Sequence, residues 1–453
     1  MKRIWLLLLF FVITGCSERD LGPFDAGADV YESKDLQTDN GQFGLDTIQD
    51  ATEIKNKSCP VSDSVFGNIF SIDPAGPDTQ IHAAAAYDGT GIWVVYNRPG
   101  SDSNFEVWAV RLACDGTPLV KPFRVNHESG YNDTDPALAV NANVVMFAWQ
   151  EDNGQSPNNL SVRYRSFNID GSPLMAADHV LDLTGGLAEG QNSWMVKLAA
   201  LPDAKFALVS AVGAKGYQGF QVWMQIIDQA GSNVGSGLLP APEKGVTQTF
   251  PTVASDMVNT IYIAWQRESN DDSTDVGVRM VSIPIIGTVK DPVQAFDPYS
   301  GHRNQAPDYT STVQGGLPWM AFQTSGQTAT HIAVRNGRDF SAASVILDDG
   351  PGMNHTPAVV SVQNGGAIVW YRQLSGIKNE VRFQEFQTDT AGNPIMLGKS
   401  VQLNTNPAAP YQPAIAALPD GYFVAWSEGK SPAFRINGVF VHKSDMQITV
   451  LYP

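Results

Sequence analysis

The chain has 453 residues, of which 43% are hydrophobic and 17% are charged, and its formal net charge is -17. Binding to a phosphate backbone needs clustered Lys and Arg, so this balance excludes nucleic acid as the main partner. The hydrophobic fraction excludes a largely disordered chain, and three cysteines are too few for a disulfide-dense scaffold. The length allows about three domains, or one long all-β domain.

Residues 1–15 form a targeting segment. Lys2 and Arg3 precede an apolar run from Ile4 to Ile13. This run is shorter than the roughly 20 residues that cross a bilayer, and it has the length of a signal-peptide core. We therefore expect a signal peptide over 1–15.

The four residues Ile13-Thr14-Gly15-Cys16 resemble the lipobox of bacterial lipoproteins. The resemblance implies that Cys16 is lipidated and becomes the mature N-terminus, which would anchor the chain to a lipid bilayer. Ser17 after the cysteine then favours the outer membrane of the bacterial cell envelope. An ordinary secretory signal, cleaved after a small residue, is the alternative.

Residues 16–58 follow as an acidic segment with little aliphatic content and no helical or alternating period. This composition predicts a disordered tether. A flexible chain of this length spans roughly 35 Å, which would hold a folded domain away from a membrane. No DxDxDG calcium loop occurs in the segment.

An internal repeat occupies the third region, residues 59–453. Each copy has a run of small and apolar residues, often led by Pro, then a turn, then a second apolar run that ends in a large anchor residue. The anchors recur about every 55 residues. Copies start near 82, 136, 195, 251, 307, 357 and 413, and their anchors are Tyr96, Trp149, Ser210, Trp265, Phe322, Trp370 and Trp426.

The second half of each copy reads as two more strands around a Gly-containing turn, as in 107–126 and 162–181. Four short strands per copy predict an all-β fold, a seven-bladed β-propeller of four-stranded antiparallel blades. The last copy lacks one strand, and 65–73 resembles that strand. We therefore expect 65–73 to complete the last blade and close the ring.

Two cysteines remain for a disulfide. Cys59 lies just before the closing strand, and Cys114 lies in a turn of the first repeat. An oxidising envelope compartment would allow a Cys59–Cys114 bridge, and two unpaired thiols are the alternative.

The whole pattern is a small-apolar run after Pro, an Asp/Asn-Gly turn, an apolar run into Trp and an acidic residue, and a later Asp-Gly turn. It resembles repeats in uncharacterised bacterial surface lipoproteins and in secreted propeller-like proteins. The resemblance covers about residues 60–453 and implies the propeller fold without a settled activity. Ser210 and Phe322 depart from the Trp of the pattern.

Motifs that would carry catalysis are absent from the sequence. It lacks the sialidase Asp-box, HExxH, GxSxG and a P-loop. The acidic residues Glu151, Asp152 and Glu268, expected in loops after the second strands, leave a glycan hydrolase open. Calcium at Asp271, Asp272 and Asp275 lacks a specific spacing, and no other metal or cofactor is expected.

One face of the predicted propeller gathers aromatic, amide and charged side chains that suit a sugar or a peptide. We therefore expect a non-catalytic binding domain for a protein or glycan. A glycan hydrolase and a structural subunit of an envelope complex are the alternatives. The candidate ligand-face residues are Tyr131, Asp133, Asp135, Gln191, Trp194, His302, Arg303, His355, Tyr411 and Gln412.

Overall fold

The computed structural model divides the chain into two compact units, Met1–Ile54 and Lys55–Pro453. It describes residues 67–443, except 128–129, 153–159, 184–187, 215, 273–274, 286–293, 297–302, 311–317, 326–329, 339–343, 348–351, 375–378, 405–409 and 431–432. The predicted signal peptide and tether, with Cys16 and Cys59, lie outside these residues. Over the described residues the chain forms strands and no helix, and so has no helix long and apolar enough to cross a membrane.

The strands form antiparallel sets in chain order. The first half contains β2 (Ile81–Tyr87), β3 (Ile92–Pro99), β4 (Phe105–Leu112) and β5 (Pro118–Arg124); then β6 (Asn132–Asn141), β7 (Val144–Asp152), β8 (Leu160–Asn168) and β9 (His179–Val180); then β10 (Ala188–Leu201), β11 (Lys205–Ala214) and β12 (Phe220–Asp228).

The second half continues with β13 (Val246–Ser255), β14 (Thr260–Ser269), β15 (Val276–Pro284) and β16 (Gln294–Phe296); then β17 (Arg303–Tyr309), β18 (Trp319–Ser325), β19 (Thr330–Asn336) and β20 (Val345–Leu347); then β21 (Met353–Val362), β22 (Gly365–Gln373), β23 (Asn379–Thr388) and β24 (Pro394–Gln402); and finally β25 (Pro410–Ala417), β26 (Gly421–Lys430) and β27 (Ala433–His442). A single parallel pair, Thr330 with Met353, links the sets β17–β20 and β21–β24.

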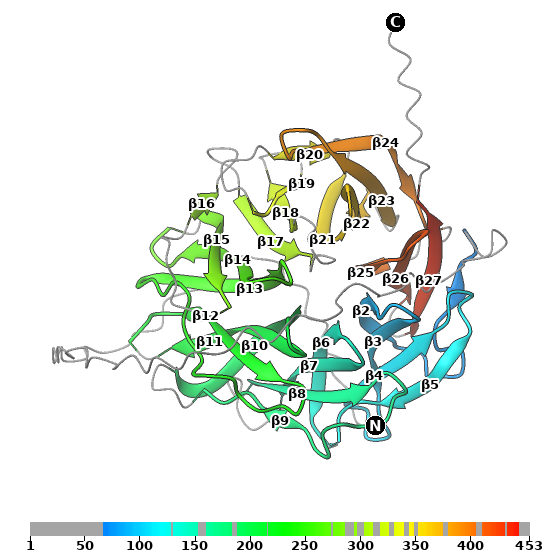
Figure 1. Ribbon diagram of the computed structural model, residues 1–453, viewed down its shortest axis with the longest axis horizontal. Helices are drawn as coiled ribbons and strands as arrows, with labels where there is room; N and C mark the ends of the chain where they lie inside the picture. The colour runs from blue at the N-terminus through cyan, green and yellow to red at the C-terminus, as the bar shows by residue number, and fades with distance from the viewer. Residues whose placement is uncertain are drawn as a thin grey trace, which may run out of the picture. The chain divides into compact units, whose positions relative to one another are not determined.

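Within the unit these sets surround a common axis (Figure 1). The first strand of each set lies nearest the axis, and the last strands, such as β5 and β24, lie outermost. Each first strand contacts the first strand of the next set, and β25 contacts β2. Antiparallel sheets arranged radially in this way make a β-propeller.

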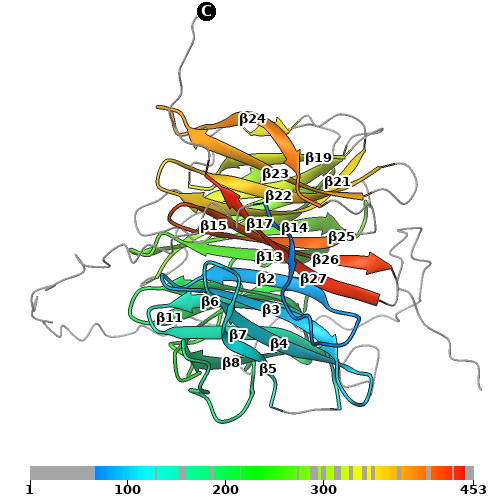
Figure 2. The ribbon, with the colours of Figure 1, turned by 90° about the vertical axis from the view of Figure 1, so that its right-hand side faces the viewer.

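The predicted closing strand is confirmed where it is described. β1 (Phe70–Ser71) pairs antiparallel with β27, so both ends of the described chain share one sheet (Figure 2). The segment after β1 is fixed by Asp73, which is 2% exposed. Its carboxylate accepts a hydrogen bond from the Tyr96 hydroxyl at 2.8 Å and pairs with Arg98 at 2.8 Å.

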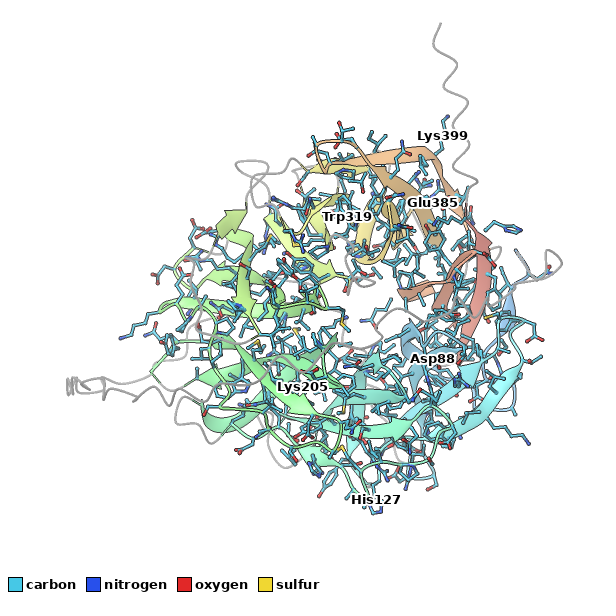
Figure 3. All side chains as sticks on the ribbon, in the orientation of Figure 1. Asp88, His127, Lys205, Trp319, Glu385 and Lys399 are labelled. Atoms are coloured by element: carbon cyan, nitrogen blue, oxygen red, sulfur yellow. The ribbon has the colours of Figure 1, made fainter. Side chains whose placement is uncertain are left out.

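The core lies between neighbouring sets. The predicted anchors are all buried, none of them more than 1% exposed. Trp149, for example, packs with Trp93, Val107 and Phe147 from two adjacent sets. In Figure 3, Trp319 lies inside the body, whereas Lys399 and His127 lie at its edge.

The third set departs from the predicted four strands. After β12 the chain makes only isolated bridges, Met224 with Leu238 and Ile227 with Asn233. Pro240 and Pro242 follow directly. Proline lacks the N–H that a ladder needs, which is consistent with pairing that ends at Leu238.

Candidate functional site

Each first strand is interrupted at the same position by a β-bulge, where the pairing register shifts by one residue. The bulged residues are not glycine, yet each has a positive φ between 39° and 56°. We call this set the bulge ring; its members are His82, Asp135, Met195, Phe250, Ala306, Thr356 and Gln412.

Positive φ strains a side chain that has a Cβ atom, and bulges commonly re-aim side chains next to functional sites. Five members of the ring directly precede a proline, as Asp135 precedes Pro136. These are the prolines that begin the sequence repeats. The missing N–H of proline falls where the bulge has already broken the ladder.

Two pairs of neighbouring ring members contact each other. His82 Nδ1 lies 3.2 Å from Asp135 Oδ1. The Phe250 amide donates to the sulfur of Met195 at 3.3 Å. The bulges therefore bring residues of neighbouring sheets into contact at two places in the ring.

Two first strands carry a charged residue two positions after the bulged residue. Lys197 of β10 and Asp308 of β17 pair at 3.9 Å, with side chains 51% and 20% exposed. Asp308 also accepts the Val359 amide at 3.0 Å. Burial raises the pKa of Asp308, and Lys197 opposes the rise. Sequence reasoning missed both residues, because the repeat describes the first strands only as runs of small and apolar residues.

Asp133 corrects one prediction. It was expected on an exposed face, but it is 2% exposed and lies between the sets β2–β5 and β6–β9. Asn126 Nδ2 donates to Asp133 Oδ2 at 2.8 Å. Burial, with the nearby charges of Glu151 and Asp178, raises the pKa of Asp133 to about 8.

The carboxylates considered for hydrolysis also differ from prediction, since they lie within strands rather than loops. Glu151, in β7, is 4% exposed, and its Oε2 pairs with Arg163 Nε at 2.7 Å. Glu268, in β14, accepts a hydrogen bond from Gln266. Arg163 lies on the neighbouring strand β8, so this ion pair is formed within one sheet.

The acidic loop after β14 also takes part in ion pairing. Arg267 binds Glu243 and Asp275, each at 2.6 Å. Asp275 was a candidate calcium ligand. Over the residues that the structure describes, no three His, Cys, Asp or Glu side chains gather closely enough to hold a metal ion.

A cavity of about 380 Å³ opens where the start of β10 meets the β11–β12 loop. Trp194, a predicted ligand-face residue, packs against one of its walls: its ring centroid lies 5.2 Å from that of Phe220. The Trp194 Nε1 atom is buried and has no hydrogen-bond partner among the described residues. The cavity lining is Asn192, Gly213, Ala214, Gly216, Tyr217, Gly219 and Phe220.

The structure places the other predicted ligand-face residues as follows. Asp135 and Gln412 belong to the bulge ring. His355 precedes the bulge of β21, where its Nδ1 lies 3.3 Å from Gln323 Oε1 and its ring stacks on Tyr371. Burial lowers the pKa of His355.

Tyr131 is partly exposed just before β6, and Arg303 is the first residue of β17. Gln191 lies within β10 and Tyr411 within β25, while His302 lies outside the described residues. The predicted face is therefore built from the starts of the first strands. We call these strand starts, the bulge ring and the loops between second and third strands the loop face.

Cys114 forms a disulfide. It is 7% exposed and packs in the same core cluster as Phe70 of β1. Its pairing with Cys59 stays a prediction, because Cys59 lies outside the described residues.

No protein-family model and no curated protein matches the chain. Among solved structures it is similar to polysaccharide lyase Uly1, with a TM-score of 0.49 and 10% identity over 82% of this chain and 90% of that one. It is also similar to the β-propeller domain of the Trilobed protease from Pyrococcus furiosus, with a TM-score of 0.45 and 8% identity over 83% and 98%.

A third similar structure is an α-L-arabinanase from Penicillium chrysogenum complexed with arabinobiose, with a TM-score of 0.44 and 13% identity over 67% of this chain and 92% of that one. Several neighbours are thus enzymes that act on glycans. At identities this low the likeness concerns the β-propeller fold and says nothing about the substrate of this chain.

Proposed function

We propose that the chain is an envelope lipoprotein whose seven-bladed β-propeller binds a glycan on its loop face. Seven copies of the sequence repeat, and the closed chain of contacts between first strands, support the blade count. The lipobox residues up to Cys16 support the lipid anchor. Incorporation of labelled palmitate that is lost in Cys16→Ser tests the anchor, and fractionation of the membranes tests the outer-membrane location.

The cavity beside Trp194 is the observation that carries the binding function. Sugars present apolar C–H faces to aromatic rings and hydroxyls to polar groups. The cavity offers Phe220, Tyr217 and the Asn192 amide, and its volume lies within the range of small-ligand sites. Trp194 packs against Phe220 and supports this aromatic wall from behind.

The charged groups near the ends of β7 and β14 favour binding over catalysis. Glu151 and Arg267 are each held in ion pairs, and Glu268 accepts a side-chain hydrogen bond. A general acid or base must instead reach the bound substrate. These three groups stabilise the contacts around them.

A glycan array probed with the purified propeller tests the proposal. We expect binding that Phe220→Ala weakens at unchanged melting temperature. Val258→Ala is the matched control, because Val258 is 59% exposed in the β13–β14 turn at the opposite ends of the strands. An array without any ligand, together with copurification of one stoichiometric envelope protein, would instead indicate the structural-subunit alternative.

A glycan hydrolase is the second candidate, favoured by one observation. Asp133 has its pKa raised to about 8 beside Glu151, and such a pair of carboxyl groups resembles an acid and a base with separated pKa values. Release of reducing sugar by the wild type, abolished in both Asp133→Asn and Glu151→Gln, would establish this function. Binding without turnover would exclude it.

A further inference from the structure

The cavity does not stand alone on the loop face. From its Tyr217 and Phe220 wall, aromatic contact continues to Trp194, whose ring tilts against Phe220. Met195 follows in sequence, and its sulfur accepts the amide of Phe250 on the neighbouring first strand. We call these five residues the apolar track; it runs from β12 over β10 to β13.

Phe250 ends the track at the bulge ring. Its side chain is 42% exposed, and it is the one aromatic among the exposed large hydrophobic residues of the described chain. Its φ of 48° is costly for a bulky residue, and Pro251 follows it. All seven ring members share such a φ, so the exposed aromatic ring is what distinguishes Phe250, and it offers a stacking surface to a ligand.

The track is longer than the cavity. β10 and β12 are separated by β11, so this part alone spans roughly 10 Å, and Phe250 lies on the next set beyond β10. A single sugar ring in the cavity would leave Phe250 uncovered. A chain of linked sugars would cover the cavity and Phe250 together.

We propose that the apolar track binds an extended oligosaccharide, with its terminal residue in the cavity and the following residues passing over Phe250. This inference rests on the proposed glycan-binding function and adds the length and direction of the ligand. Lys197, two residues beyond Met195, is engaged by Asp308. The net charge of -17 also disfavours a polyanion, so neutral chains are the first probes.

Calorimetry with neutral linear gluco-, xylo- and arabino-oligosaccharides of one to six units tests the inference. In one of these series we expect affinity to rise with length. Phe250→Ala should weaken the long members roughly three- to tenfold, as expected for one aromatic contact, and leave the shortest unchanged. Phe220→Ala should weaken all lengths, and Val258→Ala none.

Melting curves of each variant identify any that fail to fold, and Phe250→Trp, which keeps a ring at the position, should retain the gain with length. Equal affinity at every length, with Phe220→Ala still weakening binding, would overturn the track and leave the proposed function standing. Absence of binding to every saccharide in the three series and on the array would overturn both.

Discussion

The interior of the sheets and the loop face use the same residue types in opposite ways. In the interior, Glu151 of β7 pairs with Arg163 of β8, and the Trp370 indole of β22 donates to Asn354 of β21 at 2.9 Å. On the loop face, Trp194 packs against Phe220 beside the cavity, and the Phe250 ring is 42% exposed. Buried groups with partners stabilise the fold, whereas an exposed aromatic ring is available to a ligand.

The test with the largest expected effect replaces one tryptophan in each region with alanine. Trp370→Ala should lower the free energy of unfolding by about 3–5 kcal/mol, because it leaves a cavity and an unpaired Asn354. Trp194→Ala should cost clearly less stability and lose glycan binding. Chemical denaturation measures the first effect and calorimetry the second. Equal destabilisation by the two changes would contradict the comparison.

Breaking one buried ion pair within a sheet should have the next largest effect. Arg163→Met leaves the Glu151 carboxylate buried without its partner, at a cost of about 3 kcal/mol. The double variant Arg163→Met/Glu151→Leu should recover most of this loss. A double variant no more stable than Arg163→Met would show that the two residues act separately.

The buried Asp133 should make the stability of the fold depend on pH. Its pKa of about 8 in the fold lies above the roughly 3.9 of an unfolded aspartate, so folding binds a proton. The stability contributed by this group is present below pH 4 and is lost as the pH rises to about 8. Asp133→Asn should therefore raise stability at pH 8 by at least about 1 kcal/mol and leave it nearly unchanged at pH 4. A pH-independent difference would mean that the fold does not raise the pKa of Asp133.

The smallest effect is expected in the bulge ring. Ala306→Gly relieves a positive φ of 44° while it adds freedom to the unfolded chain, so the two terms should cancel within about 0.5 kcal/mol. Ala321→Gly, in the buried strand β18, should cost about 1 kcal/mol or more. Thermal melting distinguishes the pair, and equal losses would show that the ring is not strained.

Sequence periodicity predicted the strands, the buried anchors and the closing pair, because a repeat must bury the same positions in each copy. It also identified the prolines that follow five members of the bulge ring. It did not predict the bulges, because a proline does not reveal that the residue before it has a positive φ. Lys197 and Asp308 could not be paired from sequence, because their contact depends on how β10 and β17 are arranged around the axis. The burial of Asp133 depends on the packing of two sets and was likewise hidden.

The closure of the ring by β1 and β27 has a consequence for how the chain folds. Among the described strands, β1 is made first and must wait unpaired until β27, the last of them, is available. Pairings between distant parts of a chain form slowly, because a long loop must close before any contact rewards it. The seam is therefore expected to form late, and until it does, β27 keeps an unpaired edge that is open to other chains.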